Sequence, residues 1–92
     1  MKTIILDGSC MTDRTAAYRH IAEQMNFPSY FGKNLDALWD LLTTYGEADV
    51  SLFHASALLN GLGSYGCKML SCFYDAAREN PSLHFRIEEF GI

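Results

Sequence analysis

Apolar residues in this chain follow two periods, one typical of strands and one typical of helices. The run Thr-Ile-Ile-Leu at residues 3–6 precedes Asp7-Gly8, so it predicts a buried strand that ends in a turn. Residues 83–87 alternate apolar and polar side chains, which is the period of a half-buried strand. Residues 50–54 form another, less regular strand segment. The pattern therefore predicts three short strands.

A first helical segment follows the first predicted strand. Thr12 or Asp13 can cap its start, and the helix extends to about Gln24. Phe27-Pro28 marks its end, because the residue before a proline avoids helical backbone angles. The apolar face of this helix carries side chains four residues apart, namely Ala17, Ile21 and Met25.

The clearest amphipathic pattern spans residues 35–44. Asn34 is a good N-cap for this helix, and Gly46 is expected to end it. At about 100° per residue, the apolar side collects Leu35, Leu38, Trp39, Leu41, Leu42 and Tyr45. The opposite side collects the polar residues Asp36, Asp40, Thr43 and Thr44.

The last third of the chain predicts two more helices. A short helix at residues 55–60 is followed by a glycine-rich loop at residues 61–63. A longer helix at residues 66–79 ends at Asn80-Pro81. The side chains of the longer helix that face inward are Met69, Cys72, Phe73 and Ala76.

These elements follow one another as β-α-α-β-α-α-β. Strands separated by helices favour parallel pairing with right-handed crossovers. We therefore expect an α/β fold in which a small three-stranded parallel sheet packs with about four helices. A chain of 92 residues has the length of a single domain, residues 1–92.

Composition and charge narrow the possible function classes. Hydrophobic residues make up 49% of the chain and charged residues 20%, a mixture that excludes a disordered tail or a coiled coil. No apolar run reaches the roughly 18–20 residues of a membrane span. The start, MKTIILDG, lacks the apolar centre of a secretory signal, so we expect a cytoplasmic protein. The net charge of −4 argues against direct binding of DNA or RNA.

Cysteine and histidine spacing offers no metal site. Cys10, Cys67 and Cys72 have neither metal-ligand nor disulfide spacing, and we expect reduced thiols in the core. The histidines lie on three different predicted elements, without a recognisable nucleophile beside them. The sequence thus predicts no cofactor, no metal and no enzymatic activity.

Asp36 and Asp40 are the most informative polar residues. They lie four residues apart on one helix face, where like charges repel by about 0.2–0.5 kcal/mol. Asp36 lies in the first turn, where the helix dipole favours an anion, but Asp40 lies beyond it. Aromatic residues beside charges are typical of interface hot spots, and four of them flank these acids: Tyr30, Phe31, Trp39 and Tyr45.

Residue types alone leave several interpretations of this helix face open. It could be an ordinary solvated face, with the aromatic side chains packed in the core. The two carboxylates could serve a small hydrolase or hold a divalent metal, although no third ligand is visible. The acids and aromatics together could form a surface for a basic partner.

Residues 28–42, PSYFGKNLDALWDLL, closely resemble the signature of the barstar family, bacterial intracellular inhibitors of the secreted ribonuclease barnase. That family has proline, any residue, two aromatics, glycine, any residue and then NLDALWD. Outside this block the resemblance is looser, but it covers the whole chain in length and order of elements. It implies an intracellular inhibitor that binds a basic ribonuclease one-to-one without a cofactor and is monomeric when free.

The resemblance also implies roles for individual residues. Asp40 would enter the nuclease active site and take the place of the substrate phosphate, and Asp36 would contact basic groups near the same cleft. Tyr30 would pack against the region of the catalytic histidine, with Trp39 beside it. Asp75, two residues after Phe73, stands where a family glutamate meets a basic residue. The predicted partner contacts are completed by Phe31, Asn34, Thr43 and Tyr45.

Four residues at or beside the predicted contacts depart from the family pattern, and Ala48-Asp49 stands where the family prototype has a proline. Phe31 replaces a tyrosine, Tyr45 a tryptophan and Asp75 a glutamate. Thr44 stands where a glycine would allow close backbone approach. The target is therefore open between a barnase-like ribonuclease, a different ribonuclease and a contact-delivered toxin of similar fold. The alternative function is a binding module for another toxin or nuclease partner.

Overall fold

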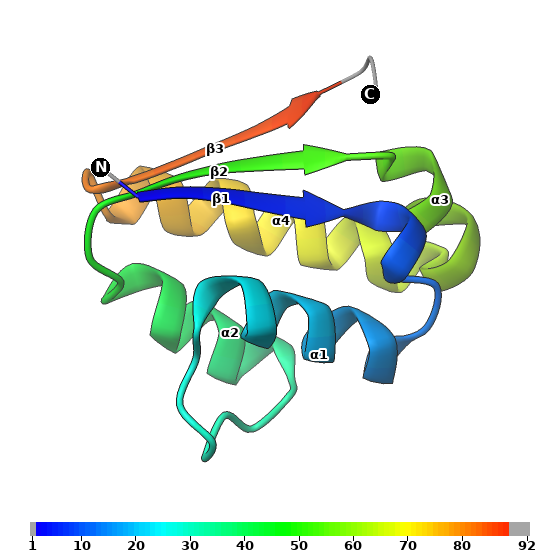
Figure 1. Ribbon diagram of the computed structural model, residues 1–92, viewed down its shortest axis with the longest axis horizontal. Helices are drawn as coiled ribbons and strands as arrows, with labels where there is room; N and C mark the ends of the chain where they lie inside the picture. Colours follow the sequence, from blue (N-terminus) through cyan, green and yellow to red (C-terminus); the bar gives the residue numbers. More distant parts are fainter. Residues whose placement is uncertain (1, 89–92) are drawn as a thin grey trace.

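Three parallel strands form one sheet in the order β1-β2-β3, and helices α1, α2 and α4 lie on one side of it (Figure 1). The computed structural model describes residues 2–88. Its elements are β1 (Lys2–Asp7), the short 3-10 helix η1 (Gly8–Cys10), α1 (Arg14–Met25), α2 (Leu35–Thr43), β2 (Ala48–Phe53), α3 (Ala55–Leu62), α4 (Ser64–Glu79) and β3 (Leu83–Glu88). The predicted α/β fold is confirmed. The predicted single domain also includes residues 1 and 89–92, which lie outside the described residues.

The sheet has one covered face and one open face. Ile4 pairs in register with Val50, and Val50 with Phe85, so these three residues share the face that the helices cover. Ile4 is 2% exposed, whereas Ile5, on the opposite face, is 44% exposed. The first strand therefore lies where it was predicted, but the prediction that the strand is buried along its whole length is wrong. The reason is that no helix among the described residues covers the face on which Ile5 lies.

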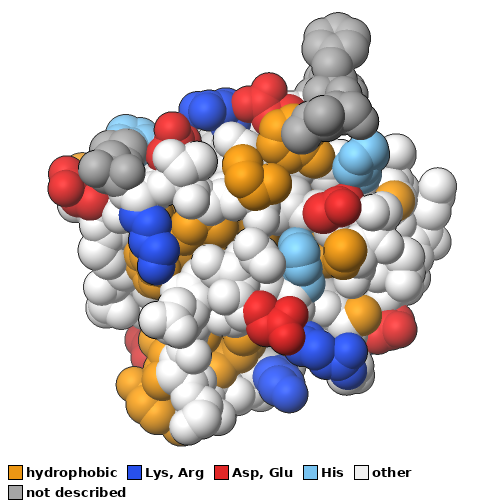
Figure 2. All heavy atoms as spheres, in the orientation of Figure 1, with side chains coloured by type: hydrophobic (Ala, Val, Ile, Leu, Met, Phe, Trp, Pro, Cys, Tyr) orange, Lys and Arg blue, Asp and Glu red, His pale blue; other side chains and the backbone are white. Residues whose placement is uncertain are grey.

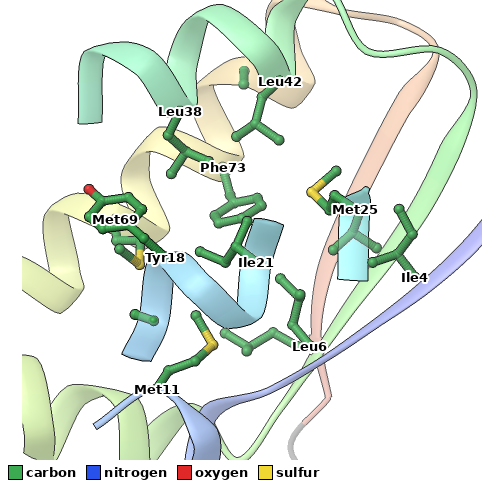
Figure 3. Packing of buried hydrophobic residues seen from close by; sticks show 14 of the residues in the cluster. Ile4, Leu6, Met11, Tyr18, Ile21, Met25, Leu38, Leu42, Met69 and Phe73 are labelled. Atoms are coloured by element: carbon green, nitrogen blue, oxygen red, sulfur yellow. The ribbon is translucent and has the colours of Figure 1, made fainter. Parts of the chain in front are cut away.

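The core lies between the sheet and the helices. Leu38 and Leu42 of α2 are both 0% exposed and point toward Phe73 of α4 (Figure 3). Fully burying a side chain of this size stabilises the fold by about 1.5–3 kcal/mol. Because α2 is held by its apolar face, the face that carries Asp36 and Asp40 points outward.

Four helix boundaries differ from those predicted, and one of them is the start of α4 at Ser64, two residues earlier than expected. α1 ends at Met25, because Asn26 adopts left-handed backbone angles with φ of 55°. α2 ends at Thr43, before the glycine that was expected to end it. α3 continues through Gly61, which was expected in a loop. A Cβ atom on Gly61 would lie 2.4 Å from the Thr12 carbonyl oxygen, so this glycine lets the helix approach the loop after β1.

The cysteines are free and lie nearer the surface than expected. Cys10 and Cys67 are exposed, and Cys72 is half-buried. The expectation of thiols in the core is wrong for the first two. Cys10 belongs to η1, which follows β1 and is not part of the sheet. Cys67 follows the buried Gly66 in α4, and its own side chain lies on the exposed side of that helix.

Candidate partner-binding surface

The start of α2 is fixed by a side-chain cap. Asn34 Oδ1 accepts a hydrogen bond from the Ala37 N–H at 2.7 Å, and Asn34 Nδ2 donates to the Gly32 carbonyl oxygen at 3.3 Å. The first bond satisfies one of the amide groups that a helix start leaves without a partner, as predicted for an N-cap. The second bond joins α2 to the preceding loop.

The outer face of α2 carries two carboxylates and no basic residue. Asp36 and Asp40 are the only charged residues of this helix, and both are exposed. Neither takes part in the ion pairs that the described part of the chain forms. The helix dipole favours the charge of Asp36 in the first turn and does little for Asp40. Both negative charges are therefore open to a molecule outside the protein.

The loop before α2 buries one aromatic side chain and exposes its neighbour. Phe31 is 8% exposed and makes edge-to-face contacts with Tyr18 and Phe27, at ring-centroid distances of 5.8 and 5.0 Å. The Phe31 N–H donates to the Pro28 carbonyl oxygen at 3.0 Å, which closes a turn. With Phe31 anchored inward, Tyr30 points outward and is 81% exposed. The buried Phe31 thus packs beneath the loop and supports the surface on which Tyr30 lies.

A groove runs between α2 and α4 beside Asp36. Trp39 borders it and is 37% exposed, so part of its ring faces solvent. Asp75 borders it from α4 and forms an ion pair with Arg78 of the same helix. The residues that line this α2–α4 groove are Leu35, Asp36, Trp39, Cys67, Lys68, Ser71, Cys72 and Asp75. The structure thus brings together three predicted site residues from two helices.

The pKa of the Cys72 thiol is influenced by an acid of each helix. Burial, with smaller contributions from the Asp75 and Asp36 carboxylates, raises the pKa of this thiol to about 11. One carboxylate of α2 and one of α4 are therefore close enough to act on the same group. Cys72 Sγ lies 3.9 Å from the Leu35 carbonyl oxygen, at the start of α2.

A second hollow lies on the other flank of α2, beside Asp40. A Cβ atom on Gly32 would lie 3.3 Å from the Ala37 Cβ atom, so the glycine allows the loop to lie close against α2. The residues that line this loop–α2 hollow are Tyr30, Phe31, Gly32, Ala37, Asp40, Leu41 and Thr44. Asp40 thus borders a hollow whose walls are about equally polar and apolar, and a partner that fills the hollow would exclude water and strengthen electrostatic contacts there.

Two other predicted contacts use their hydroxyl groups within the protein. Thr43 Oγ1 donates to the Trp39 carbonyl oxygen at 2.8 Å, one turn back in α2. The Tyr45 hydroxyl donates to the Met25 carbonyl oxygen at 2.5 Å and ties the segment after α2 to the end of α1. The roles predicted for Thr43 and Tyr45 in partner binding stay predictions.

Asn80, between α4 and β3, is a residue to which the sequence pattern assigned no role beyond ending a helix. It is 8% exposed, and its side-chain amide donates to the carbonyl oxygens of Leu42 and Tyr45, both at 3.0 Å. These partners are 38 and 35 residues away along the chain. No local pattern could have identified such bonds.

Lys68 and Ser71 line the α2–α4 groove without having been predicted. Lys68 lies four residues before Cys72, and Ser71 lies four residues before the predicted site residue Asp75. Residues at this spacing are neighbours on a helix surface. The helical period around Asp75 could therefore have found both.

Charge elsewhere on the surface is mixed. On the face shown in Figure 2, acidic and basic side chains are interspersed, and neither sign forms a continuous patch. On the open face of the sheet, Arg86 contacts Asp49 at 3.1 Å and Glu88 at 2.6 Å. The outer face of α2 differs because its two acids have no base on the same helix.

The carboxylates of α2 do not belong to a metal-ligand cluster. Within residues 2–88, no three side chains of His, Cys, Asp or Glu gather closely enough to hold a metal ion. In the same part of the chain, none of the helices combines the length and the apolar character of a membrane span.

Comparison with known proteins identifies the family. Residues 1–88 match the model of the family described as Barstar (barnase inhibitor). The chain is also similar to a protein of Bacillus subtilis (strain 168) named "Putative ribonuclease inhibitor YrdF". The two are 32% identical over 81 residues, which cover 86% of this chain and 89% of that protein. The family match includes the whole sheet, all four helices and the surface around α2. The chain therefore belongs to the barstar family of barnase inhibitors.

Proposed function

We propose that this chain inhibits a ribonuclease by filling its basic active-site cleft with the outer face of α2. Asp40 takes the place of the substrate phosphate, and Asp36 contacts neighbouring basic groups. Tyr30 and Trp39 cover these charged contacts, and Asp75 of α4 adds a contact at the rim. The complex is one-to-one and reversible and needs no cofactor. The free protein is a monomer of the cytoplasm.

The observation that carries this proposal is that neither Asp36 nor Asp40 has an ion-pair partner among residues 2–88. A cleft that binds RNA must present several cationic donors to phosphate. A carboxylate can accept charge-assisted hydrogen bonds from the same donors. The basic cleft would supply the opposite charge that the protein itself does not place beside these acids. Membership of the barstar family supports a ribonuclease as the partner.

The aromatic side chains support the proposal because each borders one of the acids. Tyr30 lines the loop–α2 hollow with Asp40, and Trp39 lines the α2–α4 groove with Asp36. Side chains that surround a charged contact exclude water from it, which strengthens the electrostatic attraction. The loop, α2 and α4 thus all contribute residues to the two hollows that border the acids.

Thr44 favours a second candidate function, the binding of another toxin or nuclease in the same manner. Its side chain lines the loop–α2 hollow, at a position where the family pattern has glycine. The hollow is therefore shaped differently from one that has no side chain there. A metal-dependent hydrolase built on these acids would instead need a third ligand beside them, and residues 2–88 form no such cluster.

The test is capture and inhibition of ribonucleases by the wild-type chain and by Asp40→Ala, Asp36→Ala, Tyr30→Ala and Asp75→Ala. Asp40→Ala should lose the most binding free energy, about 2–5 kcal/mol, mainly through faster dissociation, because it leaves cationic donors buried without a partner. Asp36→Ala and Tyr30→Ala should follow. Asp75→Ala should lose least, because its carboxylate also pairs with Arg78. Binding of Asp40→Ala within threefold of wild type would mean that the partner uses another surface.

Salt dependence gives an independent test of the acidic surface. The association rate should fall as salt rises, because charge steering is screened over about 10 Å at 0.1 M ionic strength. Asp36→Asn should flatten this dependence more than Glu23→Gln. Glu23 lies on α1 and lines neither the α2–α4 groove nor the loop–α2 hollow. Equal flattening by both variants would assign the steering to net charge alone.

A further inference from the structure

We propose that Asn80 is a positioning residue for the partner-binding surface. It fixes the carboxyl end of α2 against the end of α4, so that Asp36 of α2 and Asp75 of α4 face a partner from one groove. The inference rests on the proposed function for its biological meaning. The link between the two helices does not depend on that function, because it consists of hydrogen bonds within the chain.

The carboxyl end of α2 has carbonyl groups that need partners from outside the helix. Every helix leaves its last four carbonyl oxygens without an intrahelical partner. The usual solution is a glycine with left-handed backbone angles, but the C-cap Thr44 has φ of −110°. On the outer side, Thr44 Oγ1 donates to the Asp40 carbonyl oxygen at 2.9 Å. On the inner side, the Asn80 amide serves the carbonyl oxygens of Leu42 and Tyr45.

The side chain of Asn80 is itself held in one position. Its backbone N–H donates to the Ala76 carbonyl oxygen at 2.8 Å, which ends α4. Its Oδ1 accepts from the Ser82 N–H at 3.0 Å, which leads into β3. Both amide hydrogens and the amide oxygen are thus in use at a site that is 8% exposed. An aspartate or a leucine at this position could not donate the two bonds to Leu42 and Tyr45.

Among the side-chain hydrogen bonds of residues 2–88, the two from Asn80 are the strong polar link between the end of α4 and the end of α2, where they reach Leu42 and the following Tyr45. At the other end of α2, Cys72 Sγ lies 3.9 Å from the Leu35 carbonyl oxygen, and a thiol is a weak donor. Apolar packing in the middle of the helices allows small sliding movements that hydrogen bonds at a fixed point oppose. A binding constellation must be held to within about 0.5 Å of its working geometry, and Asn80 supplies that restraint here.

The experiment compares Asn80→Ala with Leu58→Ala, a core truncation in α3. Leu58 is 0% exposed, and α3 packs on α4 and η1, so this control lowers stability without removing the link between α2 and α4. Both variants are measured where they are fully folded. Asn80→Ala should weaken binding of the captured ribonuclease by roughly tenfold or more, and Leu58→Ala by less than about threefold. The loss caused by Asp36→Ala should also be smaller in the Asn80→Ala background, because the two changes act on one arrangement.

A second measurement uses the free protein. Trp39 is the only tryptophan of the chain and borders the α2–α4 groove, so its fluorescence reports the position of α2 against α4. Asn80→Ala should shift the emission to longer wavelength, and Leu58→Ala should leave it unchanged. Unchanged emission in Asn80→Ala, or shifted emission with binding within threefold of wild type, would overturn the positioning role. If the wild-type chain binds no ribonuclease, the proposed function fails, and the Trp39 emission still decides whether Asn80 holds α2.

Discussion

Acidic side chains have different surroundings in two regions of this protein. On the open face of the sheet, Asp49 and Glu88 both contact Arg86, at 3.1 and 2.6 Å. On the outer face of α2, Asp36 and Asp40 take part in none of the ion pairs found within residues 2–88. On the sheet face, the carboxylates are paired with a base of the same chain. On α2, the carboxylates remain available to a basic group of another molecule.

The difference shows which acids are candidates for recognition. A surface carboxylate that already has a partner gains little from a second one, since exposed ion pairs are weak and are screened by salt. A pair of like charges on one helix face slightly destabilises that helix. Asp36 and Asp40 also lie beside exposed aromatic side chains, whereas Asp49 and Glu88 lie on a sheet face with Arg86 between them.

The largest effect is expected from neutralising one acid in each region. Asp40→Asn should weaken binding to the captured ribonuclease by about 2–5 kcal/mol, because the cationic donors of the cleft lose a buried partner. Asp49→Asn, the matched change on the open sheet face, should leave affinity within twofold of wild type. Isothermal titration calorimetry of both variants measures this difference. Equal losses would end the distinction between the two regions.

Truncation on the inner face of α2 should cost stability rather than binding specificity. Leu42→Ala should lower the free energy of unfolding by about 2–5 kcal/mol, because the side chain is 0% exposed and packs toward α4. Denaturant unfolding followed by circular dichroism measures the change. Thr43→Ala, the adjacent position on a partly exposed part of the helix, is the control and should cost far less. A loss below 1 kcal/mol in Leu42→Ala would mean that α2 is not held by this face.

Alkaline pH should weaken the fold through Cys72. Its pKa is raised from the ordinary 9.0 to about 11, so the folded protein keeps this proton in a range where the unfolded chain has released it. Since the unfolded state binds fewer protons there, the free energy of unfolding should fall as pH rises from about 9 to about 11. Burial and the hydrogen bond with Tyr65 also raise the pKa of Tyr18, which adds to the loss above the ordinary value of 10.0.

The measurement is urea unfolding at several pH values for wild type, Cys72→Ala and Ser71→Ala. Cys72→Ala should flatten the slope between pH 9 and 11 and leave the contribution of Tyr18. Ser71→Ala changes a neighbour in the α2–α4 groove that does not titrate, and it should keep the wild-type slope. A slope in Cys72→Ala as steep as that of wild type would assign the alkaline loss to other groups.

The smallest effect is expected for stability when the acids of α2 are removed. Asp40→Ala should stabilise the protein by about 0.2–0.5 kcal/mol, because it relieves the repulsion between like charges. Asp36→Ala should be close to neutral, because that relief is offset by the lost interaction with the helix dipole. Thermal unfolding at low ionic strength measures both. Strong destabilisation by Asp40→Ala would show that this acid has a structural partner, and the contrast with the sheet face would disappear.

Much of the fold and part of the candidate site could be predicted from local pattern. The period of apolar residues located the strands, the helices and their order, and Asn34 marked the start of α2 correctly. Helix ends were less predictable. Gly61 lies inside α3 because of a close approach to Thr12 of a distant segment, and no periodicity of apolar residues marks the left-handed Asn26 that ends α1. The aromatic pair Tyr30-Phe31 shows the same limit in the site. The two residues are adjacent and chemically similar, yet one is 81% and the other 8% exposed.

The sequence by itself determined the elements and the acidic outer face of α2, because each follows from periodicity within a segment of some ten residues. It also determined the parallel arrangement of the strands, because helices separate each strand from the next. Only the tertiary structure decided that the sheet has an open face and that Asp75 joins Asp36 and Trp39 at one groove. It also decided that Asn80 holds the end of α2. These features depend on contacts between residues more than thirty positions apart. Such contacts form only when whole helices pack, and helix packing is set by the shape of the shared core rather than by any local run of residues.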